Sequence, residues 1–279
     1  MRNKLPLFLV KMIYYEYWPF WLFFLPLVPY WVYLSIRSRS LTYFTAVNPA
    51  MPHSGVFGES KSEILDLIND DYLPNAFYLE SGVNFEDALI KIQSVGLIFP
   101  IIAKPDVGER GAEVERLENF EQLRAYLAQS KGKIILQEYI DYSNELGILY
   151  YRKPLSAKSG ISSIVIKEFL IVKGDGHSSI RELLNQNERF RIQLPKLEQK
   201  FGVALNSILE ADVSLNLQPI GNHCLGTKFL SGQHLINAQL IKVFDAIADD
   251  IPGFYFGRFD LKVSDLESLI RVKELKFSS

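Results

Sequence analysis

A run of twenty uncharged residues near the N-terminus, from Tyr17 to Ile36, constrains the fold of this chain more than any other feature. The run contains all three tryptophans of the chain, together with several phenylalanines and tyrosines. About twenty apolar residues allow a helix to cross a bilayer, and tryptophan and tyrosine at both ends are typical of an interfacial belt. Prolines at positions 19, 26 and 29 interrupt the run, and each removes a backbone hydrogen-bond donor.

Two interpretations of this aromatic run remain open. It contacts a membrane, either spanning it or lying in its plane, or it forms a hydrophobic hairpin packed on the rest of the chain or on another subunit. Basic residues flank the run on both sides, namely Lys4 and Lys11 before it and Arg37 and Arg39 after it. They give no orientation, and they favour a monotopic or re-entrant attachment. A cleaved signal peptide fits poorly because no small-residue cleavage site follows.

Length and charge limit the remaining function classes. A chain of 279 residues forms one sizeable domain or two small ones, and its net charge of -2 gives no basic face for nucleic acid. The single cysteine, Cys224, excludes a disulfide framework and a cysteine-rich zinc site. We therefore expect a cytoplasmic protein, membrane-associated if the aromatic run binds lipid, and the sequence leaves a homo-oligomer open.

The pattern of apolar residues changes along the chain. A turn-forming stretch at 48–58 follows the aromatic run, and short helices are expected at 59–68 and 85–92. From Leu97 onward, strands alternate with helices and hairpins, with strands expected at 97–103, 133–139, 146–151, 163–172, 254–263 and 271–275. Longer helices are expected at 117–127 and 233–248, and Ser179 with Glu182 forms a capping box. This mixture predicts an α+β fold, not a doubly wound sheet.

Lys104 is the first residue with a pattern suited to chemistry. It ends an apolar strand and precedes a loop that contains Gly108 and Gly111. An ammonium group there can contact a phosphate while the loop amides approach other phosphate oxygens. The loop is neither a Walker A sequence nor a dinucleotide fingerprint, and a lysine at a strand end is often simply solvated.

Acidic residues supply the other candidates. Glu138 leaves an apolar strand and Glu145 follows a short turn, so both can accept hydrogen bonds from ribose hydroxyls, or they are plain surface acids. Arg258 and Asp260 are two apart in a strand and project from one face, and Glu274 lies in a later strand. Two carboxylates on adjacent strands form a hard oxygen site suited to Mg²⁺, with cross-strand charge pairing as the alternative.

The order of these features resembles the ATP-grasp superfamily, most closely the D-alanine–D-alanine ligase-like and cyanophycin-synthetase-like carboxylate–amine ligases. The motifs that carry the resemblance are PIIAKPDVGERG, ILQEYIDYSNELG, VIKEFLIVKGDGHSSIRELL, GRFDLKV and VKEL. They cover roughly two-thirds of the chain. The resemblance implies two α/β subdomains that clamp ATP over residues 97–279, with a hinge near 138, a preceding region at 46–96 and the aromatic segment at 1–45.

The resemblance also implies roles for the nucleotide-binding residues. Lys104 contacts ATP phosphates, and the loop from Gly108 to Gly111 closes over them. Glu138 lies at the hinge beside adenine and ribose, Glu145 binds the ribose hydroxyls, and Lys167 makes a further nucleotide contact.

Further residues are implied to act on the substrates. Asp260 and Glu274 resemble the magnesium carboxylates, and Arg258 the arginine that steadies the acyl-phosphate or tetrahedral intermediate. Lys228 or His223 touches substrate or phosphate. In such enzymes, ATP phosphorylates a small-molecule carboxylate, and an amine then attacks the acyl phosphate, with ATP and Mg²⁺ required.

The C-terminal end departs from the family pattern. The family usually reads Glu-x-Asn at the last metal strand, whereas this chain reads Glu274-Leu275-Lys276 and ends three residues later. Because lysine is no oxygen ligand, the sequence is compatible with an active ligase and also with an ATP-binding scaffold or sensor that has lost turnover. Glu109 and Arg110 stand where the D-alanine ligases carry small residues, which disfavours D-alanine as substrate.

Overall fold

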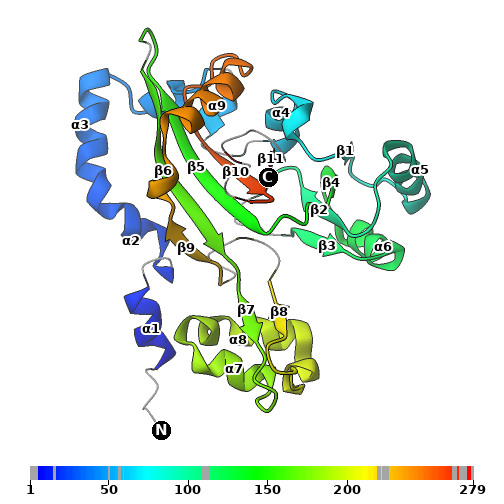
Figure 1. The fold of residues 1–279 in the computed structure, drawn as a ribbon. Helices are drawn as coiled ribbons and strands as arrows, with labels where there is room; N and C mark the ends of the chain where they lie inside the picture. Colours follow the sequence, from blue (N-terminus) through cyan, green and yellow to red (C-terminus); the bar gives the residue numbers. More distant parts are fainter. Residues whose placement is uncertain are drawn as a thin grey trace. The chain divides into compact units, whose positions relative to one another are not determined.

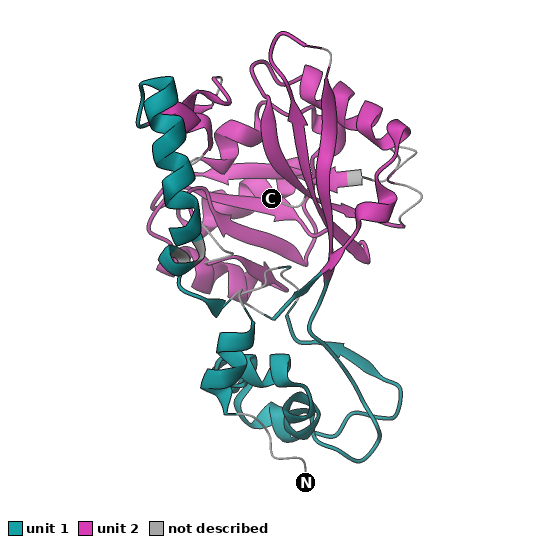
Figure 2. Cartoon of the chain, turned by 90° about the vertical axis from the view of Figure 1, so that its left-hand side faces the viewer, with its two compact units in different colours: residues 1–41, 168–229 teal, residues 42–167, 230–279 magenta. Residues whose placement is uncertain are grey.

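The computed structural model describes residues 6–14, 17–49, 51–55, 58, 60–108, 113–156, 158–218, 221, 226–265, 269 and 275–277. Contacts divide the chain into two compact units, residues 1–41 with 168–229 and residues 42–167 with 230–279 (Figure 2). Helices and antiparallel sheets occur together in the described part, so the predicted α+β class is confirmed (Figure 1).

The second unit contains a small antiparallel sheet in the order β1-β4-β2-β3. Its strands are β1 (Ala76–Leu79), β2 (Ile101–Pro105), β3 (Glu115–Leu117) and β4 (Ile134–Glu138). Two helices, α5 (Phe85–Val95) and α6 (Phe120–Gln129), share a hydrophobic core with the inward side chains of these strands, among them Leu79, Ile101 and Leu136. Because side chains alternate along a strand, Lys104 and Gln137 lie on the opposite face.

A larger sheet of the same unit has the order β11-β10-β5-β6-β9. Its strands are β5 (Asn144–Arg152), β6 (Ser159–Glu168), β9 (Lys228–Ser231), β10 (Phe256–Val263) and β11 (Leu275–Phe277). Leu146, Ile148 and Phe259 form its core with the buried residues of the amphipathic helix α9 (Ala238–Asp249), which follows the short helix η8 (Gln233–Leu235). The alternate residues of β5 and β10 therefore project from the other face.

The second unit begins with a linker of short helices that precedes β1. These are η3 (Tyr43–Ala46), η4 (Pro52–Gly55), α4 (Lys61–Leu65) and η5 (Asp70–Tyr72). Asn48 fixes it to the start of β10, since its amide nitrogen donates to the carbonyl of Phe256 at 2.8 Å. Its amide oxygen accepts the backbone N–H groups of Tyr255 and Phe256. Asn48, expected in a plain turn, is thus a buried structural residue.

The first unit combines α7 (Ile180–Gln186), α8 (Glu188–Phe201) and η6 (Gly202–Asn206) with the two-stranded sheet of β7 (Ile171–Lys173) and β8 (Ser214–Asn216). These elements share a small core of leucine, isoleucine and valine. The predicted capping box is confirmed, because the Ser179 hydroxyl accepts the N–H of Glu182 and the Glu182 carboxylate accepts the N–H of Ser179.

The N-terminal segment forms α1 (Leu7–Ile13), α2 (Phe20–Phe24), η2 (Leu25–Leu27) and α3 (Val28–Ser38). Pro26 and Pro29 occupy first-turn positions, where a missing N–H costs no helical hydrogen bond. Val10 of α1 is fully buried, the Arg189 guanidinium lies 5.8 Å from the ring of Tyr14, and the Gln193 amide donates to the Tyr17 hydroxyl. The part before Trp18 therefore packs on α8 of its own unit.

Within the described residues, no helix combines the length and apolarity that crossing a membrane requires.

Several boundaries differ from those expected. The strand predicted at 97–103 begins only at Ile101, because α5 continues to Val95 and ends at Gly96 with a left-handed φ of 74°. The helix predicted from 233 begins at Ala238, where the Asn237 side chain caps it. Helix α8 was not predicted, since polar residues dominate it and Pro195 lies inside it.

Candidate active site

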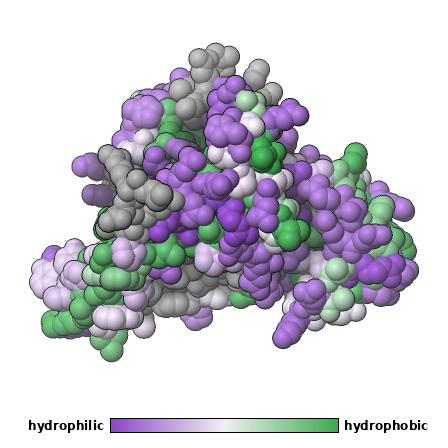
Figure 3. Space-filling view, turned by 90° about the horizontal axis from the view of Figure 1, so that it is seen from below, coloured by the Kyte–Doolittle hydropathy of each residue, from purple (hydrophilic) through white to green (hydrophobic). Residues whose placement is uncertain are grey.

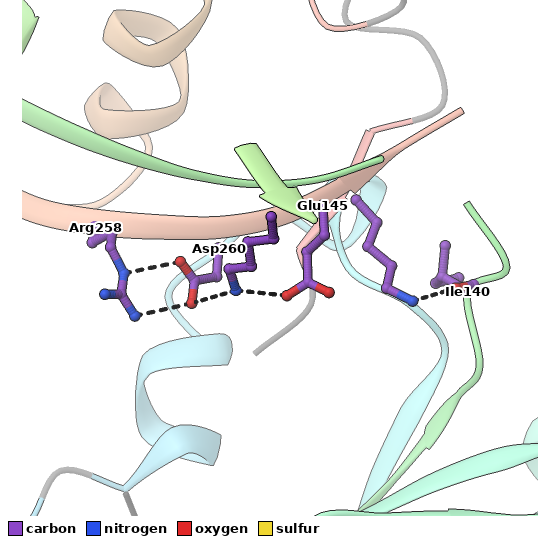
Figure 4. A network of polar contacts seen from close by, with 6 residues as sticks. Ile140, Glu145, Arg258 and Asp260 are labelled. Atoms are coloured by element: carbon purple, nitrogen blue, oxygen red, sulfur yellow. Dashed lines mark hydrogen bonds and ion pairs between the residues drawn. The ribbon is translucent and has the colours of Figure 1, made fainter. Parts of the chain in front are cut away.

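One face of the large sheet carries a row of charged side chains. Register places Glu145 of β5 beside Lys167 of β6 and beside Lys262 of β10, and Asp260 beside Gly147. Figure 4 shows Glu145, Asp260 and Arg258 projecting from the same side of their strands. This face is opposite to the one that packs on α9. The sheet thus gathers side chains that lie more than 90 positions apart in the sequence.

Lys167 connects the two carboxylates of this row. Its Nζ lies 2.6 Å from Glu145 Oε1 and 3.3 Å from Asp260 Oδ2. Arg258 donates to Asp260 Oδ2 at 3.0 Å. Glu145 and Lys167 are buried, whereas the Arg258 side chain is 61% exposed. The carboxylates of buried Glu145 and half-buried Asp260 are therefore balanced by two cations, and the open end of the network is the guanidinium.

Asp260 has one oxygen suited to a metal. Oδ1 is buried and accepts no well-aligned hydrogen bond from the described residues, although Arg258 Nε lies 2.9 Å away. No three Asp, Glu, His or Cys side chains of the described residues converge on a common point. A single carboxylate oxygen fits Mg²⁺ when phosphate oxygens and water complete the shell. Glu274, the second predicted metal carboxylate, lies outside the described residues.

Gly147 leaves the space that the Arg258–Asp260 pair occupies. A Cβ atom at this position would lie 3.1 Å from Asp260 Oδ1 and 3.6 Å from Arg258 Cδ. Glycine on β5 therefore allows the carboxylate of β10 to lie flat across the neighbouring strand.

Lys104 lies on the small sheet, on the face opposite α5 and α6. It is only 2% exposed, and its Nζ donates to Gln137 Oε1 at 2.7 Å. Burial, together with the nearby charge of Lys61, lowers the pKa of Lys104 from 10.5 to about 8. The side chain is thus a buried cation, and its described partner is a neutral amide.

The loop after Lys104 is held by the start of α4. Asp106 accepts the Ser60 hydroxyl and the Ser62 N–H, each at 2.7 Å. Burial acts to raise the pKa of Asp106, but these hydrogen bonds hold it below its usual value. Lys61 Nζ donates to the carbonyls of Pro105, Asp106 and Gly108. Gly108 is therefore part of an anchored loop, whereas Gly111 lies outside the described residues.

The segment that links the two sheets carries an aromatic ring between cations. The Tyr139 ring lies 4.3 Å from the Arg116 guanidinium and 4.9 Å from Lys262 Nζ. Lys262 also donates to the carbonyl of Ile140, and burial lowers its pKa. The Glu138 carboxylate accepts the N–H of Asn75, so it is engaged by backbone.

The structure brings Glu145, Lys167, Arg258 and Asp260 together, and it places Lys104 and Glu138 on the small sheet. Lys228 belongs to the other compact unit, where its Nζ lies 3.8 Å from Glu168. His223 lies outside the described residues.

Sequence reasoning missed three residues of this site: Gly147, Lys262 and Gln137. The period of two along each strand was the signal that could have found Gly147 and Lys262, whereas Gln137 depends on cross-strand pairing. Gly147 follows Glu145 by two residues, and Lys262 follows Asp260 by two, so each shares a face with a predicted site residue.

No protein-family model matches the chain. The comparison with curated proteins also gave no match.

Solved structures similar to this chain include the VanG D-Ala:D-Ser ligase from Enterococcus faecalis, at 14% identity and a TM-score of 0.45 over 78% of this chain and 50% of that chain. The D-alanine–D-alanine ligase from Bacillus anthracis matches at 13% identity and a TM-score of 0.41, over 79% and 54% of the two chains. A bifunctional glutathione synthetase from Pasteurella multocida matches at 15% identity and a TM-score of 0.38, over 77% and 30%.

This chain spans about half the length of each of the two ligases and less than a third of the length of the synthetase. All three are ATP-grasp enzymes, the superfamily that the sequence motifs resemble. At these identities and TM-scores the likeness concerns the fold alone and assigns neither a substrate nor an activity.

Proposed function

We propose that this chain is an ATP- and Mg²⁺-dependent ligase that joins a small-molecule carboxylate to an amine through an acyl phosphate. The observation that carries the proposal is the network in which Lys167 bridges Glu145 and Asp260 while Arg258 extends from it. It combines fixed cations with a metal-suited carboxylate oxygen on one sheet face. Such a site stabilises charge on a transferring phosphoryl group by position, without a nucleophilic side chain.

The proposed reaction has two steps, phosphorylation of the carboxylate and attack of the amine. A substrate carboxylate oxygen attacks the γ-phosphorus of ATP, the bond to the β–γ bridging oxygen breaks, and ADP leaves. The amine nitrogen then attacks the acyl carbon, inorganic phosphate leaves, and the nitrogen loses a proton to solvent. In the proposal, Arg258, more than half exposed, holds the negative oxygens that form in both steps.

Asp260 fits a role in holding Mg²⁺ through its buried Oδ1. The ion would neutralise charge on the ATP phosphates when bound. Lys167 and Arg258 both contact Oδ2, whereas Oδ1 has only the ion-pair contact with Arg258 Nε at 2.9 Å, so the proposal requires Arg258 to turn toward the phosphates when the metal binds Oδ1. Glu274 is proposed as the second carboxylate.

Lys104 of the small sheet and Lys61 at the start of α4 are proposed to face the phosphates. At pH 7 a lysine with a pKa of about 8 remains mostly protonated, so Lys104 supplies positive charge. The proximity of Lys61 explains part of the lowered pKa of Lys104, and an anionic phosphate between the two ammonium groups would relieve this repulsion. Glu138 and Glu145 are proposed to contact ribose, and Lys228 to contact substrate.

ADP release by the full chain tests the ligase proposal. The chain is supplied with ATP, Mg²⁺ and a panel of carboxylates, each with and without an amine mixture. The proposal requires ADP formation that needs both substrates and that Lys167→Met reduces at least about a hundredfold. Lys153→Met, a change at an exposed lysine, serves as the matched control. ATP binding without ADP release under all conditions would favour the scaffold or sensor reading instead.

We further propose that residues 17–36 contact a membrane. The observation is the exposure of large apolar side chains from Trp18 to Ile36. Sedimentation of the full chain with vesicles tests this contact. Equal recovery in the supernatant with and without vesicles contradicts it.

A further inference from the structure

The segment α2–η2–α3 exposes a continuous set of large apolar side chains. Six of them, here called the apolar patch, are each more than half exposed: Trp21, Leu25, Leu27, Tyr30, Tyr33 and Ile36. Green and pale surface gathers at the left of Figure 3, the side on which α2 and α3 lie in Figure 1. Contiguous exposed apolar surface of this kind marks an interaction site.

Charge along the segment that carries the apolar patch has one sign. No aspartate or glutamate occurs between Tyr17 and Gly58, whereas Arg37 and Arg39 end α3. Tyr30, Tyr33 and Arg37 follow the spacing of one helix side, the two rings stack at 6.3 Å, and Arg37 donates to the Tyr33 hydroxyl. An aromatic side that ends in a cation suits the boundary between acyl chains and lipid phosphates.

A small pocket lies beside the last turns of α3. Its volume is about 210 Å³, and Trp31, Ser35, Arg39 and Leu41 are among the residues that line it. A lipid phosphate placed at the mouth of this pocket would pair with the exposed Arg39 guanidinium, while Trp31 and Leu41 supply an apolar wall.

We propose that the apolar patch docks on a bilayer that contains anionic phospholipid, with a lipid phosphate paired with Arg39 at the mouth of this pocket. The proposal rests on the membrane contact proposed above and adds the lipid class and the residues that select it. A second copy of the chain suits the surface less well, because the segment offers no acidic residue that could pair with Arg37 and Arg39 of the other copy.

Intrinsic fluorescence provides the probe, because every tryptophan of the chain lies between positions 18 and 31. The full chain is titrated with vesicles of phosphatidylcholine alone and with vesicles that contain phosphatidylglycerol. We expect a blue shift of tryptophan emission and co-sedimentation at least about tenfold stronger for the anionic vesicles, weakening as salt is raised.

Two double variants test how much the charges beside the apolar patch contribute to vesicle binding. Arg37→Gln with Arg39→Gln should lower affinity for anionic vesicles by about 25-fold, since each basic residue near such a surface contributes about fivefold. Lys131→Gln with Lys153→Gln removes two exposed lysines elsewhere and should change affinity less than about twofold. Circular dichroism of each variant establishes that it is folded.

The outcomes are distinguishable. Equal binding to both vesicle types, unchanged by the arginine substitutions, overturns the proposed lipid class while leaving membrane contact intact. No vesicle binding, combined with a concentration-dependent dimer that Tyr30→Ser and Tyr33→Ser abolish, overturns the bilayer as occupant and assigns the patch to a second copy. ATP binding measured on the same samples reports on the ligase site separately.

Discussion

The burial of Lys104 predicts a conflict between stability and nucleotide binding. A pKa lowered from 10.5 to about 8 means that keeping the lysine charged costs the folded state about 3 kcal/mol at pH 7. Lys104→Met removes this cost but leaves the amide oxygen of Gln137 without its donor, a loss of about 1–2 kcal/mol. We expect the free energy of unfolding of Lys104→Met to exceed that of wild type by about 1–2 kcal/mol. We also expect that the variant no longer binds ATP.

The pH dependence of stability tests whether the buried charge of Lys104 causes the predicted difference. Between about pH 8 and 10.5 the unfolded chain binds more protons at Lys104 than the folded chain, so wild-type stability rises with pH in this range. From pH 7 to pH 9 the rise is about 1 kcal/mol, and the difference between wild type and Lys104→Met shrinks by that amount. Buried tyrosines such as Tyr126 have raised pKa values that act at higher pH, so the series stops at pH 9.

Urea unfolding at pH 7, 8 and 9 supplies the measurement, with Lys131→Met as an exposed-lysine control that should match wild type throughout. A variant whose free energy of unfolding at pH 7 does not exceed that of wild type, or a difference that does not depend on pH, would refute the reasoning.

Three further substitutions probe the same molecule. Gly147→Ala should push Asp260 and Arg258 aside and lower ADP release about tenfold, with little change in the urea midpoint; unchanged kinetics would contradict the packing argument. Asn48→Ala should lose about 2–3 kcal/mol of stability, because it removes the side-chain hydrogen bonds to the backbone of Tyr255 and Phe256. Its ATP affinity in calorimetry should stay unchanged, and weakened ATP binding in a folded sample would show a wider role. Lys167→Met leaves the buried Glu145 carboxylate without its cation, so thermal unfolding should show a loss of about 3 kcal/mol, which a wild-type Tm would rule out.

Local patterns predicted those parts of the site that depend on one strand. Arg258 and Asp260 share a face because they are two apart, and the structure joins them by a hydrogen bond. The Ser179–Glu182 capping box is confirmed for the same reason, since its partners are three residues apart. The α+β class follows from the spacing of strands and helices, which is also a local signal.

Pairings between distant strands were beyond sequence reasoning. Lys167 is the partner of Glu145 because β5 and β6 pair at these positions with a bulge further along, a register that neither strand fixes alone. The burial of Lys104 depends on Gln137 of another strand and on Lys61 of the linker. Sequence reasoning predicted a contact between Lys104 and phosphate, but it could not supply the buried setting or the lowered pKa.

The aromatic run shows a different limit. From composition we expected the run and the residues before it to form one hydrophobic segment. In the structure, α1 packs on α8, whereas the helices that follow expose large apolar side chains. The decisive contacts are those of Tyr14 with Arg189 and of Tyr17 with Gln193, and both partners lie more than 170 positions away.

Calorimetric titration of the full chain with ATP, in the presence and absence of Mg²⁺, tests the central claim most directly. The site predicts Mg²⁺-dependent binding that Asp260→Asn weakens by at least about tenfold and that Asp250→Asn, a change at an exposed acid, leaves intact. A folded chain that binds no ATP, or whose affinity depends on neither Mg²⁺ nor Asp260, would contradict the account.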